Sequence, residues 1–352
     1  MVNIYNVAEA AKVSIKTVSR VLNDETKVRA ETRLKELTAI EKLGYYPSIA
    51  ARTMVTQKTG LIGLITSAIT SASKVPELAG LPSIDLVKGI QSIVESSGKT
   101  LMIADTGGVE EHAENLAQTF REHRVEGMIY VSDYSQPIEV PSSFMNFPSI
   151  LINCFDPLDE YPAIIPDDEV GGFRMAEAAI NNGHRHIGFL SLPTERIAGL
   201  ERQKGFKRAH VEMNVPLNED MIIPSSKEGA NFEIENKLME DGLSKLLSLK
   251  DKPTAICCGN DRMAMNLYRL LNKMGYKIPS DMSVIGFDNY TMISELMEPG
   301  LTTVELPYID IGKVGAEILL STLQGENNFK KHKLKKKIPG KIVWRNSLKQ
   351  LS

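Results

Sequence analysis

The sequence has little cysteine, and its few cysteines do not fit a metal site or a disulfide network. Only three of the 352 residues are cysteines, and two of them, Cys257 and Cys258, are adjacent. Neighbouring side chains on a strand point to opposite faces, so this pair is poorly placed to ligate one metal ion. An odd number of cysteines also argues against a disulfide framework. We therefore expect Cys154, Cys257 and Cys258 to be small core residues, and we predict no metal site.

Signatures of membrane insertion, export and common catalysis are also missing. No segment approaches about 18 uninterrupted apolar residues. The N-terminal MVNIYN lacks the basic flank and the apolar core of a signal peptide. Neither a G-x-S-x-G nucleophile turn nor a G-x-G-x-x-G or G-K-[ST] phosphate loop occurs. These absences predict a cytoplasmic protein that has no contact with membranes, is not an enzyme and needs no cofactor.

The net charge is slightly negative overall but positive in the N-terminal segment. The formal net charge is −3, yet residues 1–60 hold 10 Lys+Arg against 6 Asp+Glu, and the rest of the chain holds 31 against 38. Only the first segment is therefore suited to approach phosphates. The length fits two or three compact units of about 100 to 200 residues each.

The segment VSIKTVSRVLN, residues 13–23, predicts the second helix of a helix-turn-helix. Ser14 can cap a helix that runs through Asn23, preceded by a short helix capped by Asn3. Helical spacing places Val18, Val21 and Leu22 on one face, and Ile15, Lys16, Ser19 and Arg20 on the other. One face can pack while the other enters a DNA major groove. An ordinary αα-hairpin with a solvated charged face fits these residues equally well.

A third helix is predicted over Thr32–Leu43, ending at Gly44. Its apolar stripe would consist of Leu34, Leu37 and Ile40, which would give a three-helix module with its own core. Tyr46-Pro47 then breaks the chain, and SIAARTM, residues 48–54, can form only one or two helical turns.

From Gly60 onward, short apolar runs alternate with amphipathic helical patterns. The runs are LIGLI (61–65), TLMIA (100–104), GMIYV (127–131), SILIN (149–153), HIGFL (186–190), AICC (255–258) and SVIGF (283–287). Such alternation predicts parallel sheets covered by helices on both faces. The number of units fits two doubly wound subdomains better than one sheet. The basic run KKHKLKKK (330–337) could be a nucleic-acid patch, but the apolar IVW after it favours a solvated hairpin leading into the last strand.

Polar residues follow directly after these runs, where open parallel sheets bind ligands. They are Thr66-Ser67, Asp105, Ser132-Asp133, Asn153, Ser191, Gly259-Asn260-Asp261 and Asp288-Asn289. Short side chains that alternate donors and acceptors suit a hydroxyl-rich ligand.

The chain resembles the LacI/GalR family of bacterial transcription repressors. The resemblance rests on VSIKTVSRVLN, then Val28, Thr32-Arg33, LGYYP (43–47) and AAR (50–52), and it continues to IVWRNS (342–347). It implies a helix-turn-helix domain over 1–46, a hinge helix over 47–59 and a periplasmic-binding-protein-like core over 60–345. Within the core, the implied N-subdomain comprises about 60–163 and 292–325, and the C-subdomain about 164–291 and 326–345.

The resemblance also implies a repressor of carbohydrate-utilisation genes, a homodimer on palindromic double-stranded operator DNA. The implied DNA-contacting residues are Tyr5, Ser14, Ile15, Lys16, Thr17, Ser19, Arg20, Asn23, Ala51 and Met54, with Met54 as a minor-groove wedge. The implied effector-binding residues are Ser67, Asn153, Arg202, Asn260, Asp261 and Asp288. The effector would be a sugar or sugar derivative, with a nucleoside or purine as the alternative.

Several of these residues also have a simpler interpretation. Asp261 precedes a helix and could be its N-cap, Asp288 could stabilise its own loop, and Arg202 could lie on a solvated helix face. Two rival functions remain: a sugar-metabolising enzyme, which the missing motifs disfavour, and a transport binding protein, which the DNA-binding module disfavours.

Overall fold

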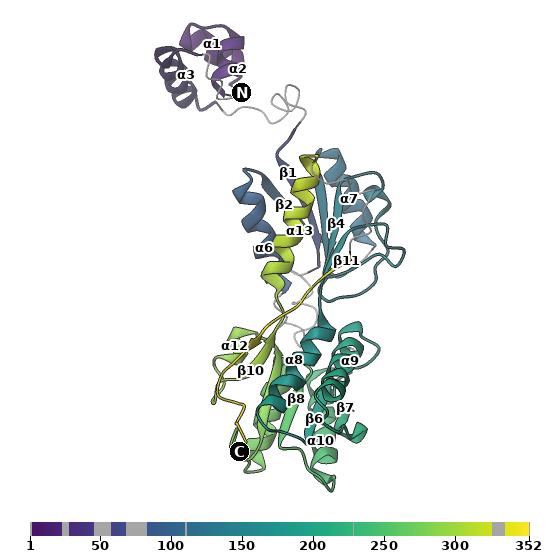
Figure 1. The fold of residues 1–352 in the computed structure, drawn as a ribbon. Helices are drawn as coiled ribbons and strands as arrows, with labels where there is room; N and C mark the ends of the chain where they lie inside the picture. Colours follow the sequence, from purple (N-terminus) through teal and green to yellow (C-terminus); the bar gives the residue numbers. More distant parts are fainter. Residues whose placement is uncertain are drawn as a thin grey trace. The chain divides into compact units, whose positions relative to one another are not determined.

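The structure is a computed structural model that describes residues 2–22, 28–45, 58–67, 83–109, 111–227, 229–325 and 335–351. The chain divides into two units, Met1–Gly60 and Leu61–Ser352 (Figure 1).

The N-terminal unit has the three predicted helices, α1 Ile4–Ala11, α2 Ile15–Leu22 and α3 Ala30–Leu43. Asn3 caps α1, as predicted, because its side chain accepts hydrogen bonds from the backbone N–H groups of Tyr5 and Asn6. Ser14 Oγ likewise accepts from the N–H of Thr17 at 3.1 Å, at the start of α2. Val7 and Val18 are fully buried between the helices.

The predicted apolar stripe on α3 is wrong for Leu34 and Leu37, whereas Ile40 is half-buried and packs against the core of the N-terminal unit. Leu34 is 68% exposed and Leu37 is 48% exposed, whereas Glu36 is fully buried. The face of α3 that packs on α1 and α2 carries Glu36 and Ala39. The small Ala39 side chain allows the helices to approach closely, and this packing outweighs the separate apolar pattern of the two leucines.

Glu36 is an unusual core residue, because neither carboxyl oxygen has a hydrogen-bond partner. Burial raises the pKa of this carboxyl, and the charge of Arg33 opposes the rise. A buried polar group without a partner costs about 1–3 kcal/mol of folding free energy. Glu36→Leu is therefore expected to stabilise the N-terminal unit by about that amount at neutral pH.

The pH dependence of this stability has a definite sign. The folded pKa of Glu36 lies above its ordinary value of 4.5. The folded state therefore holds more protons in the window between the two values, and stability falls as pH rises through it. Hydrogen exchange of α1 and α3 amides in the full-length protein measures both effects. Glu41→Leu, at an exposed position of α3, is the control. Equal protection in Glu36→Leu and wild type at pH 7 would contradict the prediction.

The large unit contains two six-stranded sheets, each with its own helices. We call these the first and second subdomains (Figure 1). The first sheet is parallel throughout, in the order β11-β5-β4-β3-β1-β2. The second sheet has the order β12-β10-β9-β8-β6-β7, with only β12 antiparallel to its neighbour. The predicted pair of doubly wound subdomains is confirmed.

The elements of the first subdomain are β1 Leu61–Thr66, α6 Ser83–Ser96, β2 Thr100–Asp105, α7 His112–Glu122, β3 Gly127–Val131, the 3-10 turn η2 Ser142–Phe144, β4 Ser149–Ile152, β5 Ala163–Pro166, α13 Tyr308–Leu323 and β11 Lys335–Ile338. Those of the second are α8 Asp168–Asn181, β6 Ile187–Ser191, α9 Ile197–Glu212, the 3-10 turn η3 Glu219–Met221, β7 Ile222–Pro224, α10 Phe232–Ser248, β8 Ala255–Cys258, α11 Asp261–Lys273, β9 Ser283–Asp288, α12 Thr291–Ser294, β10 Thr302–Glu305 and β12 Ile342–Val343. All three cysteines are buried, as expected.

The sheets assign three segments differently from the expected subdomain boundaries. β5 lies in the first sheet up to Pro166, β10 lies in the second sheet, and β11 lies in the first sheet. The predicted hairpin in the basic run is also wrong, because residues 335–338 form β11, a parallel edge strand beside β5. Lysines suit an exposed sheet edge, and Lys337 forms an ion pair at 3.2 Å with Glu201 of the other subdomain.

Helices α8 and α9 pack unusually closely. A side chain at Gly172 of α8 would collide with the backbone oxygen of Arg202, and one at Gly205 of α9 would collide with that of Glu169. Only glycine permits this approach. The contact fixes Arg202 against the start of α8.

Candidate functional site

Helix α2 presents the face that was predicted to contact DNA. Val18 is fully buried and Val21 is 5% exposed, whereas Ile15 is 40% exposed. Lys16 is also exposed, and Arg20 is half-buried at the last turn. On α1, Tyr5 is 67% exposed. The arrangement provides a buried face and a polar face on one short helix, as a helix-turn-helix requires.

The remaining predicted DNA-binding residues are either engaged in contacts within α2 or lie outside the described residues. The hydroxyl oxygens of Ser14 and Thr17 lie 2.8 Å apart in a hydrogen bond at the start of α2. Ser19 is half-buried. Asn23, Ala51 and Met54 lie outside the described residues, as does the predicted hinge turn over 48–54. Their roles stay predictions.

In the large unit, a cavity of about 50 Å³ lies between the two subdomains. It is lined by Tyr134, Ser135, Asn153, Pro166, Asp168, Leu192, Arg196, Ala198, Arg202, Asn260, Asp288, Leu306 and Tyr308. Asn153, Asn260 and Asp288 come from the carboxyl ends of β4, β8 and β9, where ligand-binding residues were expected. The structure thus brings together four of the six predicted effector residues, the fourth being Arg202.

Arg202 is the centre of the polar network in this cavity. Its Nε donates to Asp168 Oδ1 at 2.8 Å, and Nη1 donates to the backbone oxygen of Gly259 at 2.5 Å. Nη1 also lies 3.7 Å from Asp288 Oδ1, and the guanidinium covers the ring of Phe287 at 3.6 Å. Arg202 is 4% exposed. The predicted alternative, a solvated helix face, is therefore wrong.

Asp288 ends β9 in a conformation that is costly for a residue with a side chain. Its φ is 114°, and its side chain is buried. Burial raises the pKa of the Asp288 carboxyl well above its ordinary value, the charge of Arg202 lowers it, and Asp261 and Asp168 raise it further. Strained backbone of this kind is concentrated at ligand sites.

Asn153 approaches the cavity from the first subdomain. It is fully buried with a φ of 57°, a region that asparagine tolerates, and its Nδ2 donates to the backbone oxygen of Ser132 at 3.0 Å. Its Oδ1 accepts no hydrogen bond from the protein. This oxygen can accept a hydrogen bond from a ligand.

The two remaining predicted effector residues do not line the cavity. Ser67 lies beyond the end of β1. Asp261 is fully buried and accepts hydrogen bonds from the Thr303 hydroxyl at 2.6 Å and the Tyr290 N–H at 2.8 Å. Burial raises its pKa to about 7. The N-cap of α11 is Asn260, whose Oδ1 accepts from the N–H of Met263, so the alternative role of Asp261 is also wrong.

Sequence reasoning missed five polar or aromatic residues of this cavity: Tyr134, Ser135, Asp168, Arg196 and Tyr308. Asp168 and Tyr308 begin helices that follow β5 and β10, two strands absent from the predicted pattern. Recognising those strands would have placed both residues at a sheet's carboxyl end. Arg196 lies over the ring of Tyr134 at 4.9 Å.

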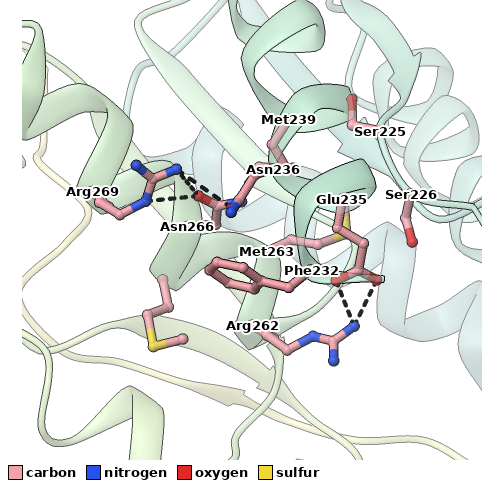
Figure 2. Close-up of a pocket in the computed structure, with 11 residues that line it drawn as sticks. Ser225, Ser226, Phe232, Glu235, Asn236, Met239, Arg262, Met263, Asn266 and Arg269 are labelled. Atoms are coloured by element: carbon pink, nitrogen blue, oxygen red, sulfur yellow. Dashed lines mark hydrogen bonds and ion pairs between the residues drawn. The ribbon is translucent and has the colours of Figure 1, made fainter. Parts of the chain in front are cut away.

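A second cavity, of about 260 Å³, lies within the second subdomain between α10 and α11 (Figure 2). We call it the α10–α11 groove. Its floor and walls include Met239, Met263, Met265 and Phe232. Polar residues also line the groove. Arg262 forms an ion pair with Glu235. The side chains of Asn236, Asn266 and Arg269 are joined by hydrogen bonds. Phe232 is 64% exposed and Met265 is 44% exposed.

In the described parts of the chain, no helix is both long enough and apolar enough to span a membrane. Within the same residues, no group of three or more His, Cys, Asp and Glu side chains could hold a metal ion.

Comparison with known proteins agrees with this geometry. Residues 3–48 match the model of bacterial regulatory proteins of the lacI family, and residues 176–348 match a periplasmic binding protein-like domain. The repressor PurR of Vibrio vulnificus is 34% identical over 333 residues, which are 94% of this chain and 95% of that protein. Catabolite control protein A of Priestia megaterium is 30% identical over 92% of this chain and 93% of its own.

Solved structures give the same result. The lac repressor dimer bound to operator and the anti-inducer ONPF has a TM-score of 0.75 at 25% identity, covering 98% of each chain. A LacI-family regulator from Rhizobium etli has a TM-score of 0.70 at 30% identity, covering 82% of this chain and 99% of its own. The chain therefore belongs to the LacI family and is a DNA-binding transcriptional repressor rather than an enzyme.

Proposed function

We propose that a small molecule bound between the two subdomains controls this repressor. The observation that carries the proposal is the convergence of Asn153 from the first subdomain with Arg202 and Asp288 from the second on a single cavity. A ligand held by both groups would favour one arrangement of the subdomains over another. The cavity is far smaller than the roughly 300–1,000 Å³ of ordinary ligand sites, so the subdomains would have to separate on binding.

A sugar or sugar derivative is the first candidate effector, and the regulated genes would serve carbohydrate use. Asp288, Asn153 and Asn260 supply the carboxylate and amide groups that grip hydroxyls. A nucleoside or purine is the second candidate. It is favoured by the rings of Tyr134 and Tyr308 beside the cavity and by the similarity to repressors named PurR.

The repressor is further proposed to act in the cytoplasm as a homodimer on palindromic operator DNA. One helix-turn-helix covers only a few base pairs, so two copies on a two-fold site are needed for high specificity. We propose that the copies pair through the α10–α11 groove, because Phe232 and Met265 leave apolar side chains exposed there.

A gel-shift experiment tests this function directly. The protein is incubated with the DNA upstream of its own gene and then with sugars, nucleosides and purine bases. Specific retardation that one compound strengthens or abolishes is expected. Retardation that no compound alters would contradict effector control, and loss of binding to competitor DNA would contradict operator recognition.

Arg20→Ala is expected to weaken operator binding by about 1–3 kcal/mol while changing binding to random DNA much less. The reason is that an arginine on the polar face of α2 can donate to guanine acceptors, whereas phosphate contacts carry no sequence information. Titrations of operator and random DNA at one salt concentration measure the two affinities. Lys12→Ala, at the C-cap of α1, is the control. Equal losses on both DNAs would show that Arg20 contacts phosphates only.

A further inference from the structure

The charge of Arg202 is already satisfied inside the protein. Asp168 accepts from its Nε at 2.8 Å, and the second carboxylate, Asp288, lies 3.7 Å from Nη1. The backbone oxygen of Gly259 accepts another N–H, and one face of the guanidinium is covered by Phe287. An arginine held in this way is poorly suited to clamp an anion, because a bound anion would compete with two buried carboxylates.

The other charged groups around the cavity also make it a poor site for an anion. Its lining contains two carboxylates, Asp168 and Asp288, and two guanidinium groups, Arg196 and Arg202, so its formal charge is balanced. Burial raises the pKa of the Asp288 and Asp261 carboxyl groups, and the charge of Asp261 raises the pKa of Asp288 further. Additional negative charge is therefore disfavoured in this environment.

From this balance we propose that Asp168 makes the cleft select uncharged effectors over phosphorylated or carboxylated ones. The inference rests on the proposed effector function and adds the chemical class. A neutral ligand with O–H or N–H donors can pair with Asp288 and with the open Oδ1 of Asn153 without disturbing the Arg202 ion pair. Asp168 acts here as a specificity-determining residue, because it sets the charge that a ligand meets at Arg202.

Isothermal titration of the full-length protein with matched pairs tests the inference. The pairs are glucose and glucose 6-phosphate, ribose and ribose 5-phosphate, and adenosine and adenosine 5′-monophosphate. Where a neutral member binds, its phosphorylated counterpart is expected to bind about tenfold more weakly or worse, because like charges meet in a desolvated site.

Asp168→Asn is expected to reduce this discrimination about tenfold, since it leaves the charge of Arg202 less balanced. Asp167→Asn is the matched control, because Asp167 is the neighbouring carboxylate, caps α8 through the N–H of Val170 and does not line the cavity. Asparagine can still cap the helix. Asp168→Glu keeps the charge and should keep the preference.

The possible failures are distinguishable. If none of the six compounds binds, the charge selection is overturned for these ligands, whereas the gel-shift panel still decides whether any effector controls the repressor. If a phosphorylated member binds as tightly as its neutral partner, effector control stands and the charge selection is overturned. An unchanged ratio in Asp168→Asn overturns the assignment to Asp168. If that variant does not fold, the wild-type ratio still decides whether the cleft rejects anions.

Discussion

Replacing Met265 with glutamate is expected to make the repressor monomeric and to weaken operator binding roughly 100-fold or more. Met265 is 44% exposed at the α10–α11 groove, through which two copies are proposed to pair. A carboxylate there would have to be desolvated on association, which opposes pairing. Without pairing, each helix-turn-helix binds its half-site alone and the effective concentration supplied by its partner is lost.

Sedimentation and operator titration on the same samples measure this effect. Met274→Glu is the matched control, since Met274 is 53% exposed at the other end of α11 and does not line the groove. The control should sediment as wild type does. If Met265→Glu remains dimeric at micromolar concentration, the copies pair through another surface. A tetrameric wild type would contradict the dimer itself.

The second large effect is expected at Asp288. Asp288→Ala should weaken effector binding by about 1.5–3 kcal/mol or more, because hydrogen bonds to charged groups contribute this much. Operator affinity without effector should stay close to that of wild type. Asp168 remains at 2.8 Å to hold Arg202, so the variant does not leave a buried cation alone.

Thermal unfolding against a panel of sugars, nucleosides and bases reports effector binding. A ligand at about 100 times its dissociation constant stabilises the folded protein by about 2.7 kcal/mol. Asp251→Ala, an exposed carboxylate before β8, is the control. Asp288→Asn keeps the volume of the side chain and tests whether loss of charge suffices. If the compound that stabilises wild type stabilises Asp288→Ala equally, Asp288 serves only the strained end of β9.

Sequence reasoning succeeded where a segment had one clear pattern. The run GMIYV became β3 and SVIGF became the start of β9, because a strand buried on both faces needs apolar residues at every position. Asn153 and Asp288 were placed in the site because they follow such runs. The same logic gave Ser67 and Asp261, yet it could not tell a side chain that faces the cleft from one that turns into the core.

Short or mixed patterns explain the failures. β10, with the sequence TTVE, and β11, with KKKI, are strands because their neighbours offer backbone hydrogen bonds, a tertiary effect that four residues do not reveal. On α3, Leu37 and Glu36 compete for the core, and contacts with α1 and α2 decide in favour of Glu36. Asp168 was missed because β5 before it was missed.

The glycine contacts between α8 and α9 have a mechanical consequence. Gly172 lies against the backbone of Arg202, and Gly205 lies against that of Glu169, so the two helices can neither slide nor separate without losing close packing. Asp168 and Arg202 are anchored on the two sides of this contact and joined by an ion pair, so we expect them to move together. The opening proposed for ligand binding would therefore change the distances from this pair to Asn153 and Tyr308 in the first subdomain, and spectroscopic labels on the two sides of the cavity would register that change.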